Sequence, residues 1–212
     1  MKKHLNPLSF LLVFMLCLIS PASASELEVV DLTEKERAAA NLFLSNFTEV
    51  GARSLDAYGE DIDLVDFAHD HLWFNDHDSY EYGEYGDYNN CRVSDDRIQG
   101  IIDKYFYDSR PVDLSQTRFD YVDGYYYHCE TGGWTPCGFA CAVSAVQTEI
   151  DTYFVSFLIF AGGNYWDNNV LNDSLDEIKA AYPYPTGYGS ALIYAEDLAD
   201  RSTYKMISYS SL

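Results

Sequence analysis

The most regular hydrophobic pattern in the chain is a ten-residue aromatic and β-branched run over 152–161, in which Ser156 is the one small polar residue. With the two-residue period of a strand, Tyr153 and Val155 face one side and Phe154 faces the other. A strand that is apolar on both faces needs cover on both faces, so we expect it in the interior of a sheet. The run is too short to cross a bilayer as a helix.

Three stretches with helical spacing come before this strand. The first, 34–47, begins with the capping box Thr33-x-x-Glu36, in which each residue can satisfy a backbone N–H of the other. The second covers 63–74, where apolar residues fall on one stripe and acids fall outside it. The third begins at Ser94, and its acidic first turn suits the positive end of the helix dipole.

Between the second and third helices, the segment 75–88 combines acids and glycines with four tyrosines and has no sustained period. We predict an exposed loop there, followed by a short strand near 88–93. The EF-hand calcium template fails in this loop, because Glu81 stands where the template needs glycine. A weak calcium site of another form stays open.

From Arg118 onward the hydrophobic period changes to two. Asp123-Gly124 is the preferred pair for a type I′ turn, so 119–122 and 125–130 should form a β-hairpin. Ser174-x-x-Glu177 is a second capping box and predicts a short helix that ends before Pro183. Further strands are predicted over 139–148, near 190–195 and near 203–210.

Helices grouped before strands are typical of the α+β class. We therefore predict N-terminal helices packed on a curved antiparallel β-meander of about six strands, with the 152–161 strand covered on both faces. A cone of the nuclear-transport-factor-2 type has a broadly similar element order. That analogy concerns the fold and implies no function.

The first 24 residues have the composition of a secretory signal peptide. Two lysines precede an apolar stretch over 8–19, and the sequence then ends in an Ala-x-Ala site at Ala24. Leu16 stands where a lipid-attachment signal needs a small residue before the cysteine. We expect cleavage before Ser25, and release of residues 25–212 as a single secreted domain without a membrane anchor.

The chain is strongly acidic. It carries 34 acidic and 13 basic residues, a net charge of −21, and signal cleavage would change this to about −23 because it removes two lysines. Such a surface repels nucleic acids and anionic membranes, so we expect neither as a partner.

Four cysteines lie after the signal: Cys91, Cys129, Cys137 and Cys141. In an oxidising compartment an even number predicts two disulfides, with three possible pairings. Zinc, with His128 as an added ligand, is the alternative, but a Cys-x7-Cys-x3-Cys spacing matches no common zinc knuckle. If Cys129 and Cys141 face each other across neighbouring strands, they would form a staple.

His69 and His71, with acids around them, look like metal ligands. Positions two apart on a helix point about 200° apart, however, so the two imidazoles cannot share an ion there. His71 falls on the apolar stripe of 63–74, which favours a hydrogen-bonded core histidine. We predict no metal site and no cofactor.

No catalytic motif stands out, which favours a non-catalytic protein and leaves an enzyme as the open alternative. The sequence around Cys137 lacks the pattern of papain-like enzymes, and Cys-x3-Cys is not a redox motif. The unusual feature is aromatic content: 19 Tyr, 12 Phe and 3 Trp. Tyrosine gives broad, rigid contacts at low entropy cost, which suits recognition of sugars or protein surfaces.

Four sequence blocks are similar to an uncharacterised family of exported or lipid-anchored bacterial α+β domains. The blocks are NLFLSNF at 41–47, DFAHDH at 66–71, DGYYY at 123–127 and DRSTYKMISY at 200–209. The resemblance implies a bacterial exported domain and supplies no activity or site.

Two functional hypotheses follow. The first is a secreted, non-catalytic recognition domain for a glycan or an extracellular protein. The second is a small-molecule-binding or hydrolytic pocket inside the curved sheet. The candidate binding residues are His71, Tyr126, His128 and Trp134. An exposed tyrosine patch would favour recognition, and a deep cleft with histidines and a shifted carboxylate would favour an enzyme.

Overall fold

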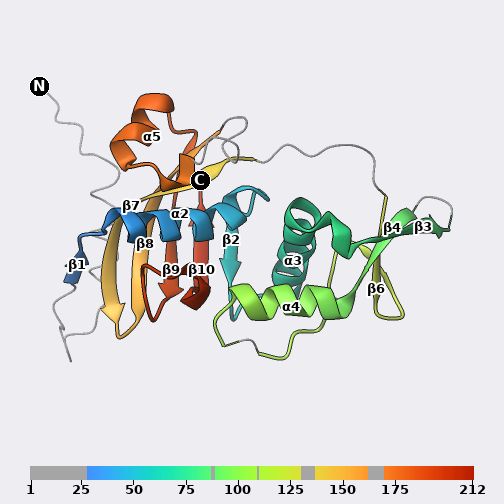
Figure 1. The fold of residues 1–212 in the computed structure, drawn as a ribbon. Coiled ribbons are helices and arrows are strands. Elements are labelled where there is room, and N and C mark those ends of the chain that lie inside the picture. The colour runs from blue at the N-terminus through green and yellow to red at the C-terminus, as the bar shows by residue number, and fades with distance from the viewer. Residues whose placement is uncertain (1–27, 87–88, 109, 130–136, 162–169) are drawn as a thin grey trace, which may run out of the picture.

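The computed structural model describes residues 28–86, 89–108, 110–129, 137–161 and 170–212. It has the predicted α+β architecture, with helices and two antiparallel sheets (Figure 1). The predicted signal segment 1–24 and Trp134 lie outside the described residues. The resemblance to a cone of the nuclear-transport-factor-2 type stays a prediction.

The larger sheet has the strand order β1–β7–β8–β9–β10–β2, and all neighbours are antiparallel. Its strands are β1 (Glu28–Val30), β2 (Ser54–Asp56), β7 (Phe139–Glu149), β8 (Thr152–Phe160), β9 (Gly187–Tyr194) and β10 (Lys205–Ser211). The hydrophobic run is therefore β8, an interior strand between β7 and β9, as its two apolar faces require.

The two faces of β8 are covered to different extents. Val155 and Phe157 are buried in the main core on one face. On the other face Phe160 is buried in a second cluster, together with side chains from α5 (Leu175–Ala181) and the short helix η2 (Val170–Asn172). Phe154, farther along this second face, is half-buried. The prediction that β8 is covered on both faces therefore holds for the face of Val155 and Phe157. On the opposite face it holds at the Phe160 end.

The first long helix, α2 (Glu34–Thr48), lies across the larger sheet (Figure 1). The predicted capping box is present: Thr33 Oγ1 accepts from the backbone N–H of Glu36, and Glu36 accepts from the backbone N–H of Thr33 at 2.7 Å. The second predicted capping box, at Ser174, caps α5 in the same way.

Polar side chains of α2 bind the backbone of β7 where β1 no longer pairs with it. Asn41 Oδ1 accepts from Ala142 N at 2.7 Å, and Ser45 Oγ accepts from Ala140 N at 3.0 Å. Arg37 donates to the Ala142 carbonyl. The helix thus satisfies backbone groups that a further strand would otherwise pair.

The smaller sheet has the order β3–β4–β6–β5. Its strands are β3 (Glu81–Tyr85), β4 (Asn89–Ser94), β5 (Asp120–Val122) and β6 (Tyr125–His128). Both turn residues of the β5–β6 hairpin have positive φ, 51° at Asp123 and 79° at Gly124, and Val122 pairs with Tyr125. The Asp-Gly prediction is confirmed.

Two helices stand between the sheets (Figure 1). They are α3 (Asp61–Asn75) and α4 (Asp95–Tyr105), close to the predicted bounds. Ser94 is the N-cap of α4 but makes no side-chain cap bond; instead the Asp95 N–H donates to the Gly124 carbonyl at 2.9 Å. A turn of the smaller sheet therefore takes part in starting this helix.

One continuous core joins the two halves. Phe47, fully buried at the end of α2, stacks on Phe67 of α3 at 4.6 Å and on Tyr209 of β10 at 5.4 Å between ring centroids. Phe106, which follows α4, meets the edge of Phe47 at 6.1 Å. Aromatic packing at one point connects α2, α3, α4 and the larger sheet.

The structure departs from the sequence prediction in how the strands are divided between the two sheets. The consecutive strands β7 to β10 form the predicted meander, but the β5–β6 hairpin pairs with β4 in the other sheet. Part of the segment predicted as an exposed loop is strand β3, in which Glu81 pairs with Arg92. Long-range pairing, which local pattern does not encode, decides both points.

Substitution of Gly189 by alanine should lower stability by about 1–3 kcal/mol, because overpacking strains a filled core. A Cβ atom there would lie 2.6 Å from the Ser210 carbonyl oxygen and against the Phe157 ring. The matched control is Gly100→Ala in α4, where the added atom meets open space. The control should raise stability by about 0.5–1 kcal/mol through helix propensity. Urea denaturation measures both, and equal effects would contradict the packing argument.

Candidate functional site

The sequence-predicted binding residues do not converge on one site. Tyr126 is fully buried on the inner face of β6, and its hydroxyl donates to the Leu114 carbonyl at 2.5 Å. His128, on the same face, is half-buried. His71 is 4 % exposed and belongs to another part of the core. These three side chains do not line the surface pocket beside Arg110 or the one beside Tyr85.

The two histidines of α3 lie in separate surroundings, as their spacing on the helix predicts. His69 is stacked on Phe119 at 3.6 Å between centroids, 5.5 Å from the His128 ring, with the Tyr80 hydroxyl 3.4 Å from its Nε2. Burial, followed by repulsion from His128 and Arg118, lowers the pKa of His69 to about 3. His69 is therefore a neutral aromatic core residue.

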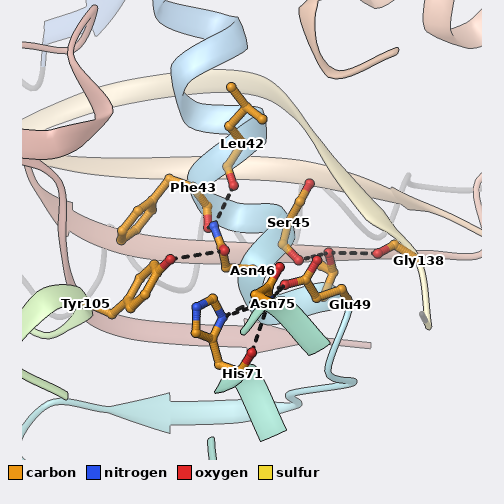
Figure 2. A network of polar contacts seen from close by, with 10 residues as sticks. Leu42, Phe43, Ser45, Asn46, Glu49, His71, Asn75, Tyr105 and Gly138 are labelled. Carbon is orange, nitrogen blue, oxygen red and sulfur yellow. Dashed lines mark hydrogen bonds and ion pairs between the residues drawn. The ribbon is translucent and has the colours of Figure 1, made fainter. Parts of the chain in front are cut away.

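A buried polar network lies on the opposite side of α3 (Figure 2). Glu49, the C-cap of α2, is 1 % exposed. The Asn75 amide nitrogen donates to Glu49 Oε1 at 2.6 Å and lies 3.2 Å from His71 Nδ1. Nearby, the Tyr105 hydroxyl donates to Asn46 Oδ1 at 3.1 Å. Side chains from three helices thus share hydrogen bonds at the junction of the two halves.

The protonation states follow from this burial. Burial raises the pKa of Glu49 to about 7, against the opposing hydrogen bond from Asn75. Burial, then repulsion from Lys104, lowers the pKa of His71 to about 3. The network therefore contains a neutral imidazole that can accept from Asn75 and a carboxyl that stays protonated well above the pH at which an ordinary glutamate ionises. Both groups are closed off from solvent, so neither can contact a substrate in this conformation.

The exposed side of the smaller sheet carries a different set of side chains, which we call the tyrosine face: Tyr85, Arg92, Asp120, Tyr125 and Tyr127. Strand alternation turns the residues of β4, β5 and β6 in this set away from the buried Cys91, Val93 and Tyr126. Tyr85, which follows a register shift in β3, joins them through its contacts with Arg92 and Tyr127. The three tyrosines are half-buried and Asp120 is exposed. Tyr85 and Tyr127 pack edge to face at 5.6 Å.

Arg92 holds the tyrosine face in place. Its guanidinium carbon lies 4.0 Å from the Tyr125 ring centroid and 4.9 Å from that of Tyr85. Its Nε and Nη2 donate to Glu81 Oε2 at 2.8 and 2.7 Å. A cation stacked on two aromatic rings and bound to a carboxylate restricts the rotamers of both rings. The aromatic surface is thereby pre-organised for contact.

A shallow surface pocket of about 480 Å³ adjoins the tyrosine face. Its described lining residues include Tyr85, Asn89, Asp120, Val122 and Tyr127. Asn89 donates to Asp120 Oδ2 at 3.2 Å, so the pocket combines oriented polar groups with aromatic and aliphatic surface. This mixture of apolar contact and a few fixed polar groups is typical of a ligand site.

The four cysteines after the predicted signal are thiols in the structure. The staple between Cys129 and Cys141 is not formed, because β6 and β7 belong to different sheets. Cys141 is buried in the second cluster, where burial raises its pKa to about 11. Cys137 is exposed. Disulfide bonding stays a prediction, and the positions of these cysteines allow one bond at most in place of the expected two.

Within the described ranges, no group of three or more His, Cys, Asp or Glu side chains is placed to hold a metal ion. In the same part of the chain, no helix combines the length and the apolar character needed to cross a bilayer.

Comparison with protein-family models, with curated proteins and with solved structures finds no match to this chain. The resemblance to exported bacterial domains therefore stays a prediction, and the site has to be interpreted from its own chemistry.

Glu49→Gln should make the protein more stable at pH 8 by about 1–3 kcal/mol, with a smaller difference at pH 5. The folded pKa of Glu49, about 7, is above its ordinary 4.5, so the folded state binds the proton more tightly. Stability from this group is full below pH 4.5 and is lost as pH rises through about 7.

The measurement is urea denaturation of both proteins at each pH. Taking the difference between them cancels most of the effect of His69 and His71, whose lowered pKa values change stability in the opposite direction. A difference that is constant across this pH range would contradict the assignment of a buried protonated carboxyl to Glu49.

At least two thiols should titrate in denatured, unreduced protein that has been purified from an oxidising compartment. Cys141 lies four residues from Cys137 along extended chain, about 13 Å, which is too far for a disulfide. The other two cysteines belong to or follow strands of the smaller sheet. With Cys141 unpaired, four cysteines can form one disulfide at most. A count of zero thiols would contradict this geometry.

Proposed function

We propose that this protein is an exported, non-catalytic recognition domain that binds a glycan through the tyrosine face of its smaller sheet. The observation that carries the proposal is the pre-organised aromatic surface of Tyr85, Tyr125 and Tyr127 beside a shallow pocket with oriented polar groups. Export is inferred from the signal-like composition of residues 1–24.

The chemistry of the tyrosine face suits a sugar better than a large apolar partner. Sugar rings have flat C–H faces that pack on aromatic rings, and their hydroxyl groups need planar polar partners such as Asn89 and Asp120. A protein interface would need a broad patch with a dry centre. The pocket here is small and sets the polar groups of Asn89 and Asp120 beside aromatic rings, so a few sugar units are the better fit.

The alternative, a hydrolytic pocket, has one observation in its favour, the raised pKa of Glu49 beside His71. Their oxygen and nitrogen are 3.9 Å apart. Catalysis requires contact with a reacting group, and these side chains are buried under α2 and α3. A structural role at the junction of the helices explains both groups without a substrate.

The test is a glycan-array screen with the residue 25–212 protein, followed by calorimetry on the glycans it retains. Tyr127→Ala should weaken binding at least tenfold, because a stacking aromatic side chain contributes about 1.5 kcal/mol or more. The matched control is Tyr184→Ala, since Tyr184 is 85 % exposed and lies outside the smaller sheet. It should leave affinity unchanged.

Three results would contradict the proposal. They are the absence of any retained glycan, glycan binding that Tyr127→Ala leaves intact, and release of cleaved sugar during incubation. Capture of an extracellular protein through Tyr127, with no glycan retained, would show that the tyrosine face recognises protein instead. Thermal denaturation of both variants checks that each is folded.

A further inference from the structure

Four neighbouring residues form a row across the smaller sheet, with an acid at each end and a cation and an aromatic ring between them. Strand pairing places Glu81 beside Arg92, Arg92 beside Tyr127, and Tyr127 beside Asp120. The row therefore reads acid, cation, aromatic, acid. Directly paired side chains on one face have Cβ atoms about 4.5–5.5 Å apart, close enough to share a bound group.

The two acids of this row differ in their partners. Glu81 binds Arg92, whose guanidinium also lies on the rings of Tyr85 and Tyr125. Asp120 accepts from the neutral amide of Asn89 and forms no ion pair with any residue that the structure describes. The described residues that line the pocket beside Asp120 include no lysine or arginine.

We infer that the pocket accepts the ammonium group of an amino sugar, with Asp120 as its counter-ion and Tyr127 beneath it. This inference rests on the proposed glycan-binding function and specifies the class of sugar. It reproduces, with a ligand cation, the arrangement that Glu81, Arg92 and two tyrosine rings already form on the same face. A cation is attracted by the face of an aromatic ring and by a carboxylate at the same time.

The charge of the whole protein supports the same class of ligand. A net charge of −21 concentrates cations near the surface and repels anionic sugars such as uronic acids. That effect is diffuse and acts on every cation. Discrimination between an amine and its acetylated form must come from a local partner, and among the described lining residues that acid is Asp120.

The experiment compares two β-1,4-linked tetramers with the same sugar backbone. The glucosamine tetramer carries ammonium groups, and the N-acetylglucosamine tetramer carries neutral acetamido groups in their place. Calorimetry at pH 6 should give about 5- to 30-fold tighter binding of the glucosamine tetramer, the range expected from one exposed ion pair with a cation–π contact. Asp120→Asn should remove this preference while preserving the hydrogen bond from Asn89.

Asp176→Asn is the matched control, because Asp176 is an exposed acid on α5, outside the smaller sheet, and its loss changes the net charge equally. It should leave the preference unchanged. An equal loss of preference in both variants would show diffuse attraction to an acidic protein and overturn the inference.

The outcome also separates this inference from the function on which it rests. Binding of both tetramers with equal affinity, and its loss in Tyr127→Ala, would overturn the amino-sugar assignment and leave the glycan-binding proposal standing. Binding of neither tetramer, with other glycans retained, would do the same. Retention of no glycan at all would overturn both.

Discussion

The architecture depends on the hydrogen bonds that hold α2 against the backbone of β7. Asn41 and Ser45 lie one turn apart on the helix, and their side-chain oxygens accept hydrogen bonds from alternate backbone N–H groups of β7. This match fixes both the position and the direction of α2 on the larger sheet. The next turn of α2 then carries Phe47 to α3 and leaves Glu49 in the interior. The helix therefore determines where the second half of the molecule can pack.

The junction built on this helix combines strong apolar packing with costly polar groups. Phe47 contacts aromatic rings from three other elements, and a carboxyl, an amide and an imidazole lie beside this cluster. Buried polar groups are stable only when each finds a partner, so they restrict how α2 and α3 can be oriented. The tyrosine face is on the other side of the smaller sheet and is free of this restriction. The core and the tyrosine face can thus change independently.

Much of the fold could be predicted because its signals are local. The capping boxes at Thr33 and Ser174 and the Asp123-Gly124 turn involve contacts within four residues. Which sheet a strand joins is decided by pairing between distant segments, which local pattern does not encode. The β5–β6 hairpin was therefore wrongly predicted to belong to one meander with β7 to β10. The same limit applies to the site. Tyr126 and His128 alternate with Tyr125 and Tyr127, and because both sets are aromatic the pattern cannot tell the inner face from the outer one. The buried Glu49 was not predicted. Its position, as a lone acid directly after the apolar stripe of the first helix, is a sequence signal that could have identified it.

The outer strands of the larger sheet have a consequence for self-association. β1 and β2 are each three residues long, whereas the strands between them have seven to eleven. A second molecule would find only a short row of backbone groups with which to extend the sheet at either border. A strand as hydrophobic as β8 would promote fibre growth at an edge, but here it lies two strands from one border and three from the other. The arrangement favours a chain that stays dispersed at high concentration.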